Sequence, residues 1–221
     1  MSTPRILIIG ANGQIGTDLA EALAHQHGTD AVITSDISGP GRVPALRHVL
    51  LDACDAPGLD RIIQEHSITQ IYLLAAALSA RGEQRPAWAW QLNMVSLLNV
   101  LEAADQHKLR VFWPSSIAAF GPSTPSENVP QSTVMDPRTV YGVSKLAGEG
   151  WCNWYHQHRG VDVRSLRYPG LISWKTAPGG GTTDYAVAIF HAALTSGHDR
   201  GCLRAATARP SRSHRWPGQR H

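Results

Sequence analysis

The chain has 221 residues, 43% of them hydrophobic and 17% charged, which suits one sizeable α/β domain and excludes wholesale disorder. No apolar run is long enough to span a membrane, and the first strand-like segment starts too close to Met1 to leave room for a signal peptide. Three scattered cysteines without CxxC spacing argue against disulfides and against a zinc site. We therefore expect a cytoplasmic protein without a metal or a membrane anchor.

The formal net charge of +3 comes from the C-terminal segment. Six arginines and no acid lie from Arg200 onward, and without these six the acidic residues outnumber the basic ones. Nothing in the body of the chain therefore indicates a surface for nucleic acid. Asp199–His221 has no apolar period and is rich in Arg, Ser and Pro, which predicts a disordered basic tail.

Short apolar runs alternate with helical patterns along the chain. The expected strands are Arg5–Gly10, Ala31–Asp36, His48–Asp52, Gln70–Ala76, Arg110–Ser116 and Val161–Tyr168. The expected helices are Gln14–Gln26, Ala56–His66, Pro86–His107 and Thr139–Arg159. This alternation predicts an α/β fold, a doubly wound parallel Rossmann sheet with helices on both faces. Two Pro- and Gly-rich segments, Phe120–Arg138 and Tyr168–Thr183, are expected to be long loops beside the cofactor.

A glycine-rich turn, Gly10-Ala-Asn-Gly13-Gln-Ile-Gly16, follows the first expected strand and opens the first helix. Glycines let a backbone turn sharply and approach a pyrophosphate, whose charge then lies at the helix N-terminus. The spacing is GxxGxxG rather than GxGxxG, and glycines in a turn are common. The pattern becomes specific through its place in the first βα turn, with an acid ending the next strand.

That acid is Asp36, twenty residues beyond Gly16. A carboxylate at this position accepts hydrogen bonds from the adenosine ribose and repels a 2′-phosphate. No arginine follows it immediately, which favours NAD over NADP as the cofactor. The alternative is that Asp36 is only a turn residue. Asp52, at the end of the third expected strand, is placed to reach the adenine edge.

A second motif, Tyr141-Gly-Val-Ser-Lys145, lies at the start of the last expected helix. Residues i and i+4 share a helix face, so the phenol and the ammonium can enter one pocket. The lysine cation is expected to lower the pKa of the phenol, which allows it to take a proton from an alcohol. YxxxK also occurs by chance. Here it follows Ser115-Ser116 at a strand end, where a hydroxyl can position the substrate oxygen.

These residues resemble the extended short-chain dehydrogenase/reductase family, the NAD-dependent epimerases and dehydratases, over about residues 4–197. Three further strings resemble the L-threonine 3-dehydrogenase branch of that family: Phe112-Trp-Pro-Ser-Ser-Ile-Ala-Ala-Phe-Gly-Pro, Asp162-Val-Arg-Ser-Leu-Arg-Tyr-Pro-Gly and Pro178-Gly-Gly-Gly-Thr-Thr-Asp-Tyr-Ala. The resemblance implies NAD-dependent oxidation of L-threonine to 2-amino-3-ketobutyrate.

The resemblance also implies roles for individual residues. Ser116, Tyr141 and Lys145 would be catalytic, with Tyr141 as the base. Cofactor contacts would come from Gly10, Gly13, Gln14, Ile15, Gly16, Asp36, Asp52, Ala53, Leu74, Ala75, Ala76, Asn93, Tyr141, Lys145, Tyr168 and Leu171. Substrate contacts would come from Ser79, Ser116, Tyr141, Gly180, Thr182 and Thr183. Family members often form homodimers through two long helices, here Pro86–His107 and Thr139–Arg159.

The C-terminal part departs from the family pattern. We expect a Rossmann domain over 1–170, the start of a substrate-binding region over 171–198, and a tail over 199–221. The tail resembles nothing in the family, and its Arg/Ala/Pro/Gly-rich composition is typical of a shifted reading frame; a native basic arm is the alternative. A substrate pocket open on one side predicts weak or absent turnover. Two competing functions remain, a nucleotide-sugar epimerase or dehydratase, and a non-catalytic NAD-binding fragment.

Overall fold

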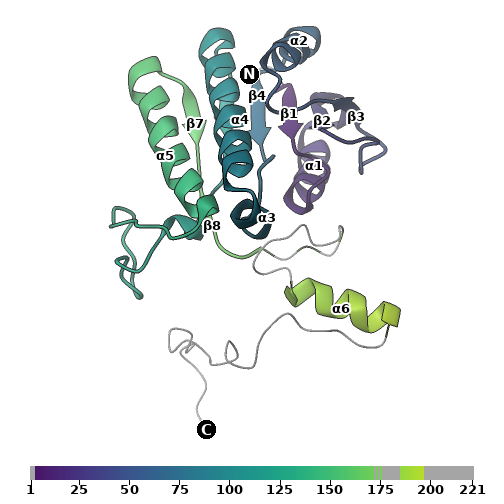
Figure 1. Ribbon diagram of the computed structural model, residues 1–221. Coiled ribbons are helices and arrows are strands. Elements are labelled where there is room, and N and C mark those ends of the chain that lie inside the picture. The colour runs from purple at the N-terminus through teal and green to yellow at the C-terminus, as the bar shows by residue number, and fades with distance from the viewer. Residues whose placement is uncertain (1–2, 172, 174, 176–184, 197–221) are drawn as a thin grey trace.

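The computed structural model describes residues 3–171, 173, 175 and 185–196. Its main sheet has six parallel strands in the order β3-β2-β1-β4-β5-β7 (Figure 1). The strands are β1 (Ile6–Ile9), β2 (Val32–Asp36), β3 (Arg47–Leu50), β4 (Gln70–Leu73), β5 (Arg110–Phe112) and β7 (Asp162–Arg164). The order reverses direction between β1 and β4, as in the doubly wound Rossmann fold, so the predicted architecture is confirmed.

Four long helices lie where the apolar periodicity predicts them. They are α1 (Gln14–His27), α2 (Ala56–His66), α4 (Pro86–His107) and α5 (Val140–Arg159). Side chains fix two of the starting points: Thr139 caps α5 by accepting from the backbone N–H of Gly142 at 3.0 Å, and Asp55 caps α2 in the same way. Pro86 begins α4, where the missing N–H of proline costs nothing.

The two faces of the sheet bury different clusters, because successive side chains of a strand point to opposite sides. Leu7 and Ile9 belong to a large cluster with residues of α2, α4 and α5. Ile6 and Ile8 belong to a smaller cluster with residues of α1. Figure 1 shows the same arrangement, with α4 and α5 side by side over one half of the sheet. Each cluster therefore holds one layer of helices against its own face of the sheet.

Two expected strands are each divided in the structure. The run 110–116 forms β5 and then β6 (Ser115–Ser116), and the run 161–168 forms β7 and then β8 (Arg167–Tyr168). Pro114, which has no N–H to donate to a ladder, separates β5 from β6. β6 and β8 pair with each other in a second, two-stranded parallel sheet. The division turns these short strands away from the main sheet.

Several shorter elements had no sequence prediction. They are α3 (Ser79–Gln84), α6 (Tyr185–Ser196) and the 3₁₀ turns η1 (Thr29–Ala31) and η2 (Ile117–Ala119). The segment 120–138 contains no helix or strand, as expected. The 199–221 tail and most of the second expected loop lie outside the described residues. The domain boundaries at 170 and 198 remain predictions.

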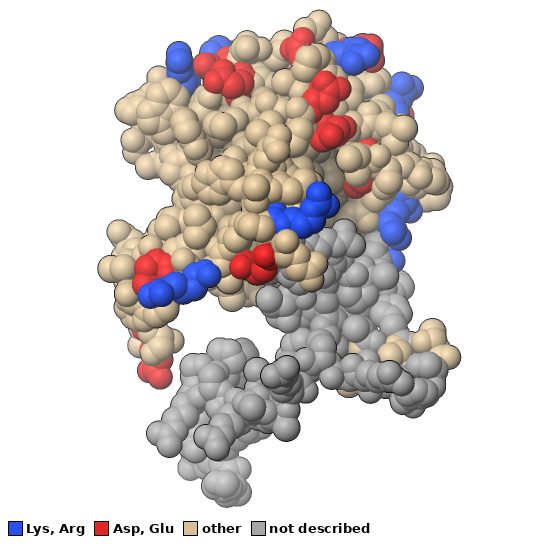
Figure 2. All heavy atoms as spheres, viewed as in Figure 1, with Lys and Arg blue, Asp and Glu red and all other residues tan. Residues whose placement is uncertain are grey.

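The described surface carries charges of both signs. On the face drawn in Figure 2, Lys and Arg side chains are interspersed with Asp and Glu over the described part. No helix in the described part of the chain combines the length and apolar character needed to cross a membrane. Among the same residues, no group of three or more His, Cys, Asp or Glu side chains is arranged to hold a metal ion.

Candidate active site

A cleft of about 920 Å³ lies at the carboxyl ends of the strands, where ligands bind in open α/β sheets. It begins at the β1–α1 turn and ends at the start of α5. Most of the residues predicted from the sequence line it: Gly10, Gly13, Gln14, Ile15, Gly16, Asp36, Asp52, Ala53, Leu74, Ala75, Ala76, Ser116, Tyr141, Lys145, Tyr168 and Leu171. The topology thus brings together side chains that are widely separated in sequence.

The glycine turn closes tightly around the end of β1. Gly10 has a positive φ of 85°, and a Cβ there would lie 2.5 Å from the backbone nitrogen of Ala75 on the neighbouring strand connection. A Cβ on Gly16 would lie 2.6 Å from the Cα of Ala11, so only glycine lets α1 approach the turn this closely. Both positions require glycine for the reason that the motif predicts.

The start of α1 is suited to an anionic ligand. Its N-cap is Gly13, and no side chain of the described chain caps it, so the first backbone N–H groups face the cleft. Nε2 of Gln14 is buried and has no hydrogen-bond partner within the described part. A buried donor without a partner is costly, and a phosphate oxygen would satisfy it. The residues present therefore fit the diphosphate of a dinucleotide.

Asp36 lies beside this turn at the end of β2. Its Oδ2 accepts a hydrogen bond from the backbone N–H of Asn12 at 3.1 Å, and its Oδ1 accepts from Ser38. The sequence analysis missed Arg42, which also lines the cleft. The backbone N–H of Arg42 donates to Oδ1 of Asn12 at 3.1 Å, so the loop after β2 returns to the glycine turn. Arg42 does not follow Asp36 immediately in the chain, but it lines the same cleft.

The candidate catalytic residues meet at the other end of the cleft. Ser116 ends β6, and Tyr141 and Lys145 occupy successive turns of α5. The Ser116 hydroxyl lies close enough to the Tyr141 phenol to lower its pKa. Nζ of Lys145 donates to the carbonyl of Pro114 at 2.6 Å and lies 5.4 Å from the centre of the Tyr141 ring. The arrangement holds a phenol, a hydroxyl and an amine around one point of the cleft.

Burial changes the titration of both α5 residues. It raises the pKa of Tyr141, and the nearby Ser116 hydroxyl offsets only part of this. Lys145 is only 3% exposed, and burial lowers its pKa to about 7, against a smaller opposing effect of Cys152. The expected lowering of the tyrosine pKa by a lysine cation is therefore not found: the pKa of Tyr141 is raised. The amine is too strongly desolvated to hold its proton well at neutral pH.

Two predicted cofactor residues lie at the edge of the site. Asn93 does not line the cleft. It is buried in α4, where its Oδ1 accepts from the backbone N–H of Ala77 at 2.7 Å and its Nδ2 donates to Oγ of Ser144 at 2.9 Å. Its position is that of a support between the two long helices. Leu171, by contrast, is partly exposed at the mouth of the cleft.

The predicted substrate residues are placed only in part. Ser116 and Tyr141 face the cleft. Ser79 begins α3, but the structure does not describe its side chain. Gly180, Thr182 and Thr183 lie outside the described residues.

Glu149 and Arg167, for which there was no sequence prediction, lie beside predicted residues together with Ser115 of the expected Ser115-Ser116 strand end. Ser115, Glu149 and Arg167 form a polar cluster immediately behind the catalytic group. Each is next to a predicted residue, in the chain or on the helix: Ser115 precedes Ser116, Arg167 precedes Tyr168, and Glu149 lies one turn after Lys145. That adjacency is the signal that could have identified them.

Comparison with known proteins agrees with this geometry. A model of the NAD dependent epimerase/dehydratase family matches residues 6–210, which includes part of the tail expected to depart from the family. The chain belongs to this family. An uncharacterized epimerase/dehydratase of Staphylococcus saprophyticus is 46% identical over 196 residues, 87% of this chain and 61% of the relative. The chain thus spans about three fifths of that relative's length.

Solved structures of other family members share the fold. The holo form of the GalE-like L-threonine dehydrogenase from Cupriavidus necator has a TM-score of 0.84 and 67% identity, covering 87% of this chain and 63% of its own. A monomeric L-threonine 3-dehydrogenase from a metagenome database has a TM-score of 0.83 and 46% identity, covering 87% of this chain and 62% of its own. These likenesses support an NAD-dependent oxidoreductase.

Proposed function

We propose that this chain binds NAD and oxidises the β-hydroxyl of L-threonine to give 2-amino-3-ketobutyrate. The observation that supports this most directly is the convergence of Ser116, Tyr141 and Lys145 on a cleft whose other end carries the glycine turn and Asp36. The 67% identity to an L-threonine dehydrogenase supports the substrate.

The cofactor would extend along the cleft between these two ends. The N-terminus of α1 and Gln14 would hold the diphosphate, and Asp36 would accept hydrogen bonds from the adenosine ribose. Asp52 and Ala53 would border the adenine, while Leu74, Ala75 and Ala76 line the cleft floor. Lys145 would hold the second ribose, and Tyr168 and Leu171 would border the nicotinamide.

The chemistry follows from the three catalytic side chains. NAD, when bound, would supply the hydride acceptor. Tyr141 removes the hydroxyl proton of threonine while the hydrogen on the same carbon leaves with its electron pair, so the C–O single bond becomes a carbonyl. Ser116 donates a hydrogen bond to the developing oxygen charge. Lys145, when protonated, stabilises the phenolate.

The remaining substrate contacts rest on the resemblance. We propose that Ser79, Gly180, Thr182 and Thr183 contact the ammonium and carboxylate of the amino acid. A small zwitterion needs enclosure from water before hydride transfer, and short glycine-rich segments can close over it.

The decisive experiment measures NADH formation from L-threonine and NAD binding by calorimetry, on the same protein. We expect NADH to form slowly, in keeping with the weak turnover predicted from the sequence, and Tyr141→Phe to abolish it without loss of NAD binding. NAD binding without turnover by the unmutated chain would contradict the oxidation and support a non-catalytic NAD-binding fragment. Conversion of a UDP-sugar under the same conditions would support the epimerase or dehydratase alternative.

We also propose that the protein forms a homodimer through α4 and α5. An apolar groove of about 770 Å³ lies between these helices, and Trp151 and Trp154 on α5 are 41% and 40% exposed. Exposed aromatic residues in one patch are typical of an interface. We expect light scattering to give a dimer, and Trp154→Glu to give a monomer. Val134→Glu, at an exposed apolar side chain in the 120–138 loop, is the control and should leave the dimer intact.

A further inference from the structure

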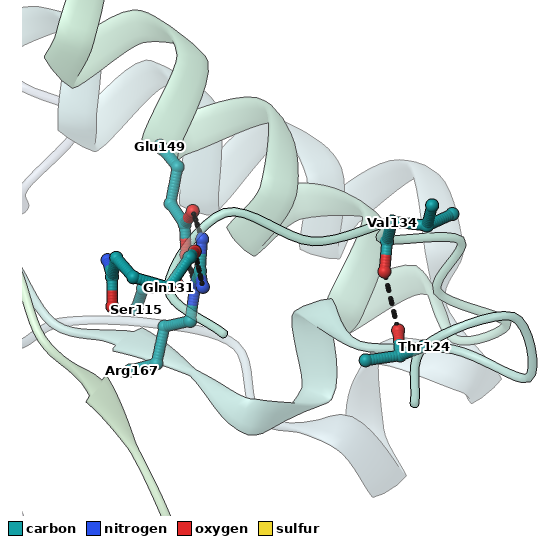
Figure 3. Close-up of polar contacts among 6 residues, drawn as sticks. All are labelled: Ser115, Thr124, Gln131, Val134, Glu149 and Arg167. Carbon is teal, nitrogen blue, oxygen red and sulfur yellow. Dashed lines mark hydrogen bonds and ion pairs between the residues drawn. The ribbon is translucent and has the colours of Figure 1, made fainter. Parts of the chain in front are cut away.

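Behind the catalytic group, a half-buried ion pair joins three parts of the chain (Figure 3). Arg167 on β8 donates from Nε and Nη2 to the two carboxylate oxygens of Glu149 on α5, each at 2.8 Å. The side chains are 17% and 19% exposed. A two-pronged pair of this kind fixes the direction of both side chains as well as their separation.

The same carboxylate also holds β6. Oγ of Ser115 donates to Oε1 of Glu149 at 2.5 Å. One turn earlier on the helix, Lys145 donates to the carbonyl of Pro114. Two successive turns of α5 therefore bind two successive residues of the segment that leads into Ser116. This segment leaves the main sheet at Pro114, and β6 pairs with none of the six described strands of that sheet. The side-chain bonds to α5 hold it in place instead.

The pairing of β6 with β8 carries this restraint to the reacting group. Ser115 pairs with Arg167, and the next pair in register is Ser116 with Tyr168. The clamp formed by Glu149 and Arg167 therefore lies one residue behind Ser116 and Tyr168, which line the cleft together with Tyr141.

A third arm of the cluster reaches the long loop. Nη1 of Arg167 donates to the carbonyl of Gln131 at 3.0 Å, and its guanidinium lies 5.4 Å from the centre of the Phe120 ring. The loop is also closed on itself, because Oγ1 of Thr124 donates to the carbonyl of Val134 at 2.7 Å (Figure 3). The 120–138 loop is thus bound to the same arginine that pairs with Glu149, the residue that holds β6.

The pair is charged at neutral pH. Burial alone would raise the pKa of Glu149, but the hydrogen bonds from Arg167 and Ser115 outweigh it and lower the pKa. Removing either partner leaves the other as a half-buried charge without its counter-ion, which the surrounding backbone must then accommodate.

We infer that Glu149 and Arg167 are positioning residues that set Ser116 and Tyr168 against Tyr141 and connect them to the 120–138 loop. This inference deepens the proposed function, because it concerns how the same site is aligned. It assigns a role in the reaction to two residues that do not line the cleft.

The test compares Arg167→Met and Arg167→Lys with Arg164→Met. Arg164 on β7 also pairs with an aspartate, Asp162, but its side chain is 78% exposed, so it is a matched control for losing an arginine ion pair. Affinities for NADH and for ADP-ribose, which lacks the nicotinamide, are measured for each variant. Both Arg167 variants should weaken NADH binding about tenfold more than ADP-ribose binding, since only the nicotinamide end is misaligned. Lysine keeps the charge but not the two-pronged geometry, and should not rescue.

Turnover gives an independent measurement. With L-threonine, kcat of the Arg167 variants should fall about 100-fold with little change in KM, as for a misplacement of about 1 Å at a reacting group. An unchanged ratio of the two affinities, including equal weakening of NADH and ADP-ribose binding, would overturn the inference. If thermal stability fell at the same time, the pair would have only a structural role.

A ligand-free measurement separates this inference from the proposed function. Amide hydrogen exchange over residues 113–120 should accelerate in Arg167→Met but not in Arg164→Met, whether or not the chain binds a cofactor. Failure of the unmutated chain to bind NADH would sink the proposed function alone. Unchanged exchange over this segment would sink the positioning role.

Discussion

Replacing Lys145 by methionine removes a buried amine whose pKa is lowered by burial from 10.5 to about 7. In the unfolded chain this lysine keeps its proton up to the ordinary value. Between these two values the unfolded state binds one proton more than the folded state, so the lysine makes the free energy of unfolding increase with pH. Below about pH 7 both states are protonated, and the contribution is flat at its least favourable level.

The size of the effect follows from the gap. Each tenfold change in proton affinity is worth about 1.4 kcal/mol. Allowing for half-protonation near the lowered pKa, wild-type stability should rise by about 2 kcal/mol relative to Lys145→Met between about pH 7 and about pH 9. The variant also loses the bond to Pro114 and the contact of Nζ with the Trp113 ring at 4.4 Å. Those losses lower the free energy of unfolding of the variant by the same amount at every pH. Only the pH dependence of the difference from wild type therefore tests the titration of Lys145.

Urea unfolding followed by circular dichroism, at several pH values across this window, measures the difference. Lys108→Met serves as the control, because the Lys108 side chain is 78% exposed and its loss should leave the wild-type pH dependence unchanged. Parallel curves for wild type and Lys145→Met would refute the reasoning, since they would mean that Lys145 keeps its proton in the folded chain.

Three further predictions concern other parts of the site. Asp36→Ala should weaken NAD binding about tenfold or more through loss of a charged hydrogen-bond acceptor. The same change should strengthen NADP binding, because Arg42 lines the same cleft. Calorimetry with both cofactors measures this, and adding Arg42→Ala should cancel the gain for NADP. Thr139→Ala should lower the free energy of unfolding by about 1 kcal/mol through loss of the α5 cap, measured by urea unfolding. Asn93→Leu should cost about 1–3 kcal/mol, because the N–H of Ala77 loses its acceptor and the hydroxyl of Ser144 loses the donor Nδ2; an unchanged unfolding midpoint would contradict that role.

Local patterns were sufficient to predict most of the fold. The bounds of the four long helices followed from apolar periodicity to within one residue; Thr139, expected as the first residue of the last helix, is its N-cap. The glycine turn and Asp36 could be connected because parallel strands bring their carboxyl ends to one edge. The division of one strand at Pro114 was also readable in principle, since proline leaves a ladder without a donor.

The features that could not be predicted from the sequence involve residues that meet only in the folded chain. Arg42 returns to the cleft through a loop whose path no periodicity describes, and Arg167 meets Glu149 only after β6 has paired with β8. The lowered pKa of Lys145 required knowledge of its burial, because sequence gives the i, i+4 spacing but not the solvent. Asn93 was expected on the correct helix but as a cofactor contact. Its hydrogen bonds instead join Ala77 and Ser144 behind the cleft.

The unequal clusters on the two sheet faces have a consequence for ligand binding. α1 packs on the smaller cluster, whereas α2, α4 and α5 share the larger one. Elements with fewer buried apolar contacts open locally at lower free energy, so amide protons of α1 should exchange before those of α4. A dinucleotide bound at Gly13 and Gln14 would oppose that opening by mass action. The bound ligand would then protect the amides of α1 from exchange, so the local stability of this helix would depend on whether the cleft is filled.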